Sequence, residues 1–200
     1  MQTRDFSDLK PGYQVVYADP PWLYYGDPNK DQAAGKHYQM MSPEELRALP
    51  VKNILAKKAV VLMWTTSSKM AEAIELLKAW GCFYRGVFQV WVKTSKSGNI
   101  IHGQGARPSF TKPTAEYLLV GSTQAKGKTL PIFSEKMPNV VLSERPENVH
   151  SRKPAVFRSN IEELFGEVQR VELFAREAPA GWDAWGNEVP LKTLKLKAKK

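Results

Sequence analysis

Short runs of apolar and β-branched residues recur along the chain, and polar segments separate them. These runs have the length and composition of strands that are buried in a sheet. They cover residues 13–18 (YQVVYA), 59–64 (AVVLMW), 82–93, 115–121, 139–142 and 170–175. Three of the segments between them have the patterns of short helices, which are predicted over residues 42–49, 67–81 and 155–166.

Two of the predicted helices carry clear local signals. Ser42 is a good N-cap residue, Pro43 suits the first helical position, and Glu45 completes a capping box. The segment 67–81 places four apolar side chains on one face of a helix: Met70, Ile74, Leu77 and Trp80. It is therefore predicted to form an amphipathic helix.

The alternation of strands and helices predicts an α/β fold around a largely parallel sheet. In such sheets, ligands bind beyond the carboxyl ends of the strands. The stretch from Asp19 to Trp22 follows the first predicted strand, and Trp64, Lys93 and Arg176 also lie at strand ends. Packing in the core is the favoured interpretation for three tryptophans: Trp64, Trp80 and Trp91.

Length and charge add an expected partner to this picture. The 200 residues, of which 42% are hydrophobic, predict one globular domain over residues 1–190. The net charge of +9 includes five lysines within residues 191–200, a tail that is predicted to be disordered. Such an excess of positive charge favours an anionic partner such as nucleic acid. No apolar run approaches the roughly 20 residues of a membrane span, so no membrane partner is expected.

The cysteine and histidine content narrows the chemistry further. A single cysteine, Cys82, cannot form an internal disulfide bond, which predicts a cytoplasmic protein. His37, His102 and His150 are scattered along the chain without neighbouring metal-ligating residues, so no metal site is expected.

The stretch after the first predicted strand, Asp19-Pro20-Pro21-Trp22, combines unusual chemical groups. Asp19 offers a carboxylate acceptor, and the main-chain carbonyl of Pro20 is a second, rigidly held acceptor. Trp22 supplies a broad aromatic face on which a base can stack. Two acceptors beside a flat ring suit a planar base with an exocyclic amino group, whose two N–H bonds they would hold. The competing interpretation is a stiff turn with Trp22 in the core.

These residues carry a resemblance to a known family. The sequence ADPPW after a strand resembles the catalytic motif of amino-group methyltransferases, and the form with tryptophan resembles the MT-A70 family. The resemblance extends over roughly residues 13 to 190 and includes HYQMMSPEELRAL, LMWTT, VFQVWVKT, AEYLLVG, HSRKP, ELFAR and GWDAWGNE. It implies a Rossmann-like methyltransferase fold with S-adenosylmethionine as the methyl donor. The catalytic motif precedes the donor-binding motif, as in the permuted β class.

On the side of the target base, the resemblance assigns roles to six residues. It implies that Asp19, Pro20, Pro21 and Trp22 hold the base, with Asp19 also touching the amino group of the donor. It places Tyr38 on a first gate loop near the base, where it would sandwich the ring together with Trp22. Glu116 corresponds to a glutamate that contacts the target adenine.

On the side of the donor, the resemblance implies five further contacts. Lys153 corresponds to a donor-binding lysine that pairs with the methionine carboxylate, and Arg176 to an arginine beside the donor ribose. Glu172 is expected to orient Arg176. Asn187 corresponds to an asparagine on the donor, and Glu188 stands where the messenger-RNA enzyme has a glutamine. Residues 177–180 (EAPA) replace the His-Asn pair that this enzyme uses at the ribose.

The resulting functional hypothesis is transfer of a methyl group from S-adenosylmethionine to N6 of adenine in nucleic acid, with DNA preferred. Arg107 and Lys112, in the long polar segment 94–112, are candidates for contacts with phosphates. A homodimer, or pairing with a related subunit, would supply additional nucleic-acid surface.

Three alternatives remain open at this point. The first keeps the reaction and takes adenosine in RNA as the substrate. The second takes N4 of cytosine or a protein side-chain amide as the target. The third is a non-catalytic nucleic-acid-binding subunit of a methyltransferase complex, although such relatives typically lose the Asp-Pro-Pro-Trp set.

Overall fold

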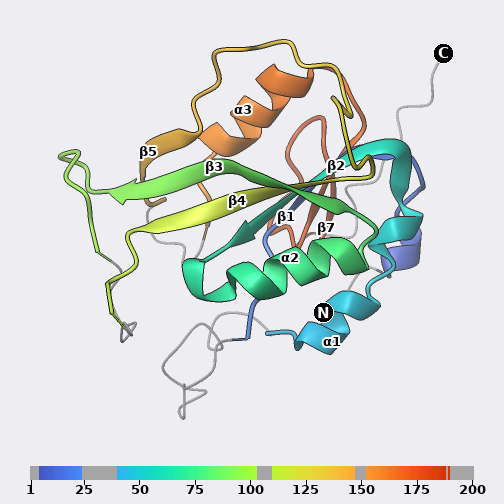
Figure 1. Ribbon diagram of the computed structural model, residues 1–200, viewed down its shortest axis with the longest axis horizontal. Coiled ribbons are helices and arrows are strands. Elements are labelled where there is room, and N and C mark those ends of the chain that lie inside the picture. Colours follow the sequence, from blue (N-terminus) through green and yellow to red (C-terminus); the bar gives the residue numbers. More distant parts are fainter. Residues whose placement is uncertain (1–4, 24–39, 103–109, 147–151, 188, 190–200) are drawn as a thin grey trace.

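A mixed sheet forms the centre of the protein (Figure 1). The structure is a computed structural model that describes residues 5–23, 40–102, 110–146, 152–187 and 189. Seven strands within these ranges form the sheet: β1 (Tyr13–Ala18), β2 (Leu55–Thr65), β3 (Phe83–Thr94), β4 (Ala115–Ser122), β5 (Val140–Glu144), β6 (Arg170–Leu173) and β7 (Asp183–Trp185). The predicted α/β class is confirmed, and the tail 191–200 lies outside the described residues.

The strand order is β5-β3-β4-β2-β1-β6-β7. Neighbouring strands run parallel in four of the six pairs. The exceptions both involve β4, which is antiparallel to β2 and to β3. The first residues of β4 therefore lie at the same edge of the sheet as the last residues of its neighbours, and this reversal brings the candidate site together.

Helices cover both faces of the sheet (Figure 1). The helices α1 (Pro43–Ala48) and α2 (Met70–Ala79) lie on one face, and α3 (Val156–Phe165) lies on the other. Helix α1 begins as predicted, with Ser42 and Glu45 forming a complete capping box. Two 3-10 turns, Phe6–Asp8 and Val51–Asn53, precede β1 and β2.

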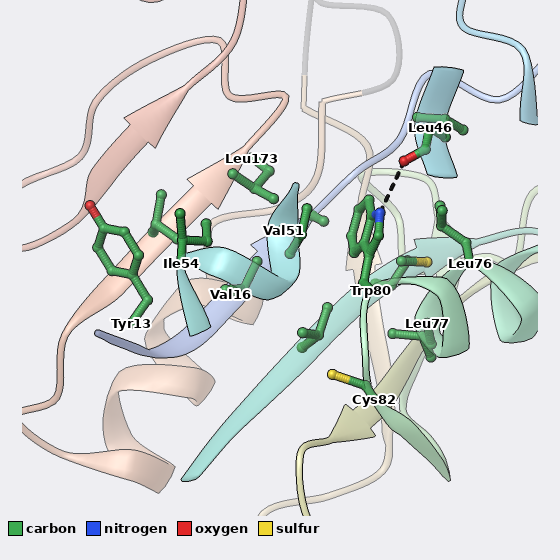
Figure 2. Packing of buried hydrophobic residues seen from close by; sticks show 14 of the residues in the cluster. Tyr13, Val16, Leu46, Val51, Ile54, Leu76, Leu77, Trp80, Cys82 and Leu173 are labelled. Atoms are coloured by element: carbon green, nitrogen blue, oxygen red, sulfur yellow. Dashed lines mark hydrogen bonds between the residues drawn. The ribbon is translucent and has the colours of Figure 1, made fainter. Parts of the chain in front are cut away.

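One hydrophobic cluster fills the space between the sheet and the first two helices (Figure 2). Trp80, at the end of α2, is fully buried there, and its indole Nε1 donates a hydrogen bond to the carbonyl of Leu46 in α1 at 3.0 Å. Because that bond satisfies the only polar atom of the ring, this large side chain is buried with no unpaired polar atom.

A second cluster lies between the sheet and α3. Trp64 is fully buried in it, packs edge-on against Phe157 with ring centroids 4.8 Å apart, and donates a hydrogen bond from Nε1 to the Tyr17 hydroxyl at 2.6 Å. Core packing is confirmed for the three tryptophans for which it was predicted: Trp64, Trp80 and Trp91.

The elements differ from the predicted ones mainly at their ends. Strand β2 begins at Leu55, earlier than predicted, and the helix predicted over 67–81 opens with a 3-10 turn at Ser67–Lys69 before α2. Strand β7 was not predicted, because three residues that include an aspartate carry no strand pattern and pair only with β6. No helix in the described ranges is long and apolar enough to cross a membrane.

Candidate active site

The motif Asp19-Pro20-Pro21-Trp22 forms a tight turn directly after β1. The amide of Trp22 donates to the carbonyl of Pro20 at 2.8 Å, and the amide of Met41 donates to the carbonyl of Pro21 at 3.1 Å. The two proline rings and these bonds fix the backbone of the turn. A carbonyl oxygen has two lone pairs, so Pro20 keeps capacity for a second donor while its direction is held.

Trp22, the last residue of the motif, is largely buried beside this turn. Only 8% of the residue is exposed, it belongs to the first hydrophobic cluster, and its Nε1 donates to the carbonyl of Trp64 at 3.0 Å. Most of the Trp22 side chain is thus buried, and its stacking on a base stays a prediction. Its burial anchors the turn that aims Asp19 and the Pro20 carbonyl.

The antiparallel direction of β4 places Glu116 beside the end of β3. Glu116 is the second residue of β4 and pairs in register with Trp91, two residues before Lys93. The amino group of Lys93 contacts Glu116 Oε1 at 2.5 Å. Glu116, predicted to contact the base, therefore lies at the same sheet edge as the turn after β1.

Lys153 joins the two carboxylates of the site. It precedes α3, and its Nζ lies 2.5 Å from Asp19 Oδ2 and 3.3 Å from Glu116 Oε2. The same ammonium lies over the ring of Trp64, 5.5 Å from its centroid. The side chain of Lys153 is only 8% exposed, whereas that of Asp19 is 31% exposed. Asp19 is thus the member of this pair that solvent, and hence a substrate, can reach.

The ion pairs determine the charge states of this group. Burial alone would lower the pKa of Lys153, but the carboxylates of Asp19 and Glu116 raise it above its usual value. Burial would raise the pKa of Glu116, but the ammonium groups of Lys153 and Lys93 bring that pKa below its ordinary value. Burial does raise the pKa of Asp19, a rise that Lys153 opposes. The arrangement is an alternating series of cations and anions.

A second charged cluster lies at the end of β6. Arg158 of α3 contacts Glu172 Oε2 at 3.3 Å and Glu177 Oε1 at 2.9 Å, and Arg152 contacts Glu177 Oε2 at 2.5 Å. The salt bridge that the structure gives Glu172 is therefore to Arg158, although the sequence interpretation expected Glu172 to orient Arg176. Glu172 Oε2 is buried and has no hydrogen-bond donor among the described residues.

The backbone between β6 and β7 is strained and tightly packed. Phe174, within the ELFAR motif, has a φ of +60°, which is uncommon for an aromatic residue. Residues with such strained backbone conformations are often found at functional sites. Gly186 lies against the backbone of Ala175, where an added Cβ would meet the carbonyl oxygen at 2.1 Å. The next residue, Asn187, is exposed at this edge of the sheet.

Comparison with known proteins identifies the family of this site. A family model described as MT-A70 matches residues 13–188. The chain belongs to the MT-A70 family. The resemblance seen in the sequence is therefore confirmed, as is the Rossmann-like fold class with its mostly parallel sheet.

Individual relatives agree with the MT-A70 assignment. The type II methyltransferase M.MunI of a Mycoplasma species is 33% identical over 89% of this chain and 78% of its own length. The human N(6)-adenine-specific methyltransferase METTL4 is 28% identical over 88% of this chain, and the N6-methyladenosine RNA methyltransferase MTA1 of Pyricularia oryzae is 28% identical over 90%. This chain spans only 37% of METTL4 and 47% of MTA1.

The structure brings together some of the predicted site residues of this MT-A70 chain. Asp19, Glu116 and Lys153 are in direct contact through Lys153. Arg176 is half-buried after β6 and acts electrostatically on Asp19. Lys112 is exposed between β3 and β4. Three of the predicted residues lie outside the described ranges: Tyr38, Arg107 and Glu188.

Two charged residues of the site were missed by sequence reasoning. Lys93 was placed at a strand end without a role, and the antiparallel direction of β4, which gives it Glu116 as a partner, could not be read from the pattern. Arg158 has no motif of its own. Its segment was predicted only to be helical, so nothing indicated the contact with Glu172.

No metal site accompanies these charged residues in the part of the chain that the structure describes. There, no group of three or more histidine, cysteine, aspartate or glutamate side chains is placed to hold an ion.

Glu172 is expected to make stability depend on pH. Burial is the main cause that raises its pKa from 4.5 to about 7; Arg158 opposes this rise, and the charges of Asp19 and Glu177 contribute to it. Between these two values the folded protein keeps a proton that the unfolded chain releases, so stability is lost as the pH rises. Urea unfolding should show that the stability of Glu172→Gln relative to wild type increases by about 3 kcal/mol from pH ~4.5 to ~8.

The variant Glu163→Gln provides the matched control on α3. Glu163 is exposed on this helix, so its replacement should leave the difference from wild type nearly constant over the same pH range. A constant difference for Glu172→Gln as well would show that Glu172 ionises as an ordinary surface carboxylate.

Proposed function

We propose that this MT-A70 chain transfers the methyl group of S-adenosylmethionine to the exocyclic amino group N6 of adenine in DNA. The single observation that carries the proposal is the fixed turn after β1. In it the carboxylate of Asp19 and the carbonyl of Pro20 are adjacent acceptors at the carboxyl edge of the sheet. Family membership and relatives named as adenine methyltransferases support the same chemistry.

The acceptor pair addresses the main difficulty of the reaction. The lone pair of an adenine amino group is delocalised into the ring, which makes N6 a poor nucleophile. Hydrogen bonds from its two N–H groups to Asp19 and to the Pro20 carbonyl would favour a pyramidal nitrogen and direct its lone pair outward. Positioning of this kind lowers a barrier by several kcal/mol. The surplus proton leaves after transfer, to Asp19 or to water.

The charged groups of the site fit the proposed donor. When bound, S-adenosylmethionine supplies an electrophilic methyl group on a sulfonium centre, together with a carboxylate, an ammonium group and ribose hydroxyls. Lys153 is a cation suited to the carboxylate, and Asp19 is an anion suited to the ammonium group. The buried Oε2 of Glu172 accepts no hydrogen bond among the described residues, although Arg158 lies 3.3 Å away, and it is a candidate acceptor for the donor at the same edge. Arg176 lies after β6 and Asn187 lies after β7, on the two chain segments next to Glu172.

DNA is proposed ahead of RNA as the substrate. Among the three relatives described above, the type II methyltransferase is the one that this chain covers over the largest share of its length, 78%. The enzyme named for RNA is covered over 47% only. We also propose that a homodimer, or pairing with a related subunit, supplies additional surface for nucleic acid.

The test uses the full chain, labelled S-adenosylmethionine, and two long substrates that lack modified bases: genomic DNA from a methylation-deficient source and transcribed RNA. Long substrates contain most short recognition sequences, which are unknown here. Mass spectrometry of the digested DNA should detect N6-methyldeoxyadenosine and little product from RNA. N6-methyladenosine from RNA alone would reverse the substrate preference, and N4-methylcytosine would change the target base.

A non-catalytic subunit would give a different result. It would form no methylated nucleoside and would show no heat of donor binding in calorimetry. Donor binding without product would instead point to a missing partner subunit.

A further inference from the structure

We propose that the edge of the sheet opposite the candidate active site binds the phosphate backbone of the DNA substrate, at a distance from the target base. The inference rests on the proposed function, because it assumes that the substrate is DNA. The surface lies at the amino ends of β2 and β3 and is termed the basic edge here. Its six members are all exposed: Lys52, Lys57, Lys58, Arg85, Lys126 and Lys128.

Three segments that are distant in the sequence meet at the basic edge. Strand β4 ends at Ser122, which pairs in register with Val60 of β2 and with Phe83 at the start of β3. Before β2, the stem of Lys52 lies 3.2 Å from the position that a Cβ would take on Gly81, two residues before β3. The cations therefore gather on one part of the surface, although they are spread over the sequence.

Hydrogen bonds hold the turn that follows β4 against the other two segments. The hydroxyl of Thr123 and the side-chain amide of Gln124 both donate to the carbonyl of Lys57, at 3.0 Å and 3.2 Å. The guanidinium group of Arg85 donates to the carbonyls of Gln124 and Gly127, at 3.0 Å and 3.2 Å. The lysines on either side of this glycine are thus anchored beside those at the start of β2.

No carboxylate neutralises the cations of the basic edge within the segments that carry them. The ranges 50–60, 81–88 and 121–131 contain no aspartate or glutamate. None of the six cations forms a salt bridge with another described residue, whereas Arg47 and Lys78 each pair with a glutamate, at 3.3 Å and 2.7 Å. Like charges held together repel one another, and a polyanion relieves this repulsion when it binds. The surface therefore fits a nucleic-acid backbone.

The position of the basic edge decides which part of the substrate it contacts. Ala18, directly before Asp19, pairs with Met63 in β2, and Lys57 lies six residues earlier in the same strand. The basic edge is therefore roughly 20 Å from the catalytic turn. Because phosphates follow one another every ~3.4 Å along a strand of B-DNA, those at the basic edge lie about six nucleotides or more from the target base. Such contacts add affinity without touching the reacting atoms.

The experiment uses the full chain and a labelled, unmodified duplex of about 30 base pairs, which is long enough to reach both edges at ~3.4 Å per base pair. The basic-edge variant combines Lys57→Gln, Lys126→Gln and Lys128→Gln. The control variant combines Arg47→Gln, Lys78→Gln and Lys136→Gln, which removes the same number of exposed positive charges elsewhere. Affinity is measured by fluorescence anisotropy over a series of salt concentrations, and folding by thermal unfolding.

The basic-edge variant should bind the duplex at least about tenfold more weakly at ~100 mM salt, and its plot of log K against log salt should be flatter by about 2. The control should retain the wild-type slope. For methylation, KM for DNA should rise while kcat at saturating DNA stays unchanged, because these contacts are equally strong in the ground state and the transition state. Replacement of the same three lysines by arginine should preserve affinity, since the charges remain.

The inference is overturned if the basic-edge variant keeps the wild-type affinity and salt slope, or if the control variant loses as much affinity. It is also overturned if the basic-edge variant loses binding only to vesicles that contain phosphatidylserine, since the surface would then serve a membrane. Wild-type protein that binds the duplex but methylates no nucleic acid would instead contradict the proposed function, so the two failures are distinguishable.

Discussion

Substitution of Asp19 by alanine is expected to reduce methyl transfer at least about a thousandfold, equivalent to about 4 kcal/mol of transition-state stabilisation. The change removes the carboxylate that would hold one N–H of the amino group. The fold should persist, because Lys153 keeps Glu116 as a partner and 31% of the Asp19 side chain is already exposed. Turnover is measured with labelled donor, and folding by circular dichroism and thermal unfolding.

The exposed carboxylate Asp8 provides the control for this experiment, since Asp8→Ala removes an equal charge from the 3-10 turn before β1, whereas the motif follows the other end of that strand. This control should retain wild-type turnover. The isosteric variant Asp19→Asn separates charge from shape, because an amide keeps one acceptor oxygen but no negative charge. Turnover of Asp19→Ala within tenfold of wild type would remove the basis of the proposed mechanism.

The fold follows from the sequence where local signals are strong. Strand β1 and the capping box before α1 were predicted because apolar runs, caps and proline placement act over a few residues. Strand β7 was not, since its three residues become a strand only by pairing with β6. The reversed direction of β4 is likewise a property of the assembled sheet, and no local pattern encodes it.

The residues of the candidate site show the same difference between local signals and tertiary contacts. Asp19 and Glu116 were found through motifs, whose residues are defined by position along the chain. Their counterions were not: Lys93 and Arg158 gain their roles only from elements that meet at the sheet edge. Trp22 was interpreted as an open stacking face because its motif suggests contact with a ring. The hydrogen bond from its Nε1 to the carbonyl of Trp64 is a tertiary contact, and it holds most of the side chain in the core.

The charges of the site form a continuous set rather than isolated pairs. Asp19 raises the pKa of Glu172, Lys153 bridges Asp19 to Glu116, and Lys93 completes the set. Such coupling means that removing one member changes the protonation of others. Kinetic effects of single variants in this set should therefore be interpreted together with their pH profiles.

Replacement of Gly186 by alanine is expected to destabilise the protein by about 3 kcal/mol, which corresponds to a fall in Tm of roughly 6–12 °C for a chain of this size. The new Cβ would lie 2.1 Å from the carbonyl oxygen and 2.6 Å from the amide nitrogen of Ala175. Both are backbone atoms, so no side chain can move aside. The amide of Ala175 also donates to the carbonyl of Trp185 at 2.9 Å, and that bond must break or stretch if β7 moves away.

The displacement should reach the proposed donor site, because Asn187 follows Gly186 directly. We therefore expect weaker donor binding in calorimetry as well as a lower Tm. Gly127→Ala is the matched control: its φ is +76° and nothing lies within 4 Å of the added Cβ. It should cost about 1 kcal/mol through backbone strain alone and leave donor affinity unchanged. Of these two glycines, Gly127 has a left-handed φ and free space, whereas Gly186 has no left-handed φ but lies against backbone atoms. Equal losses of stability in the two variants would therefore show that the contact with Ala175 relaxes easily.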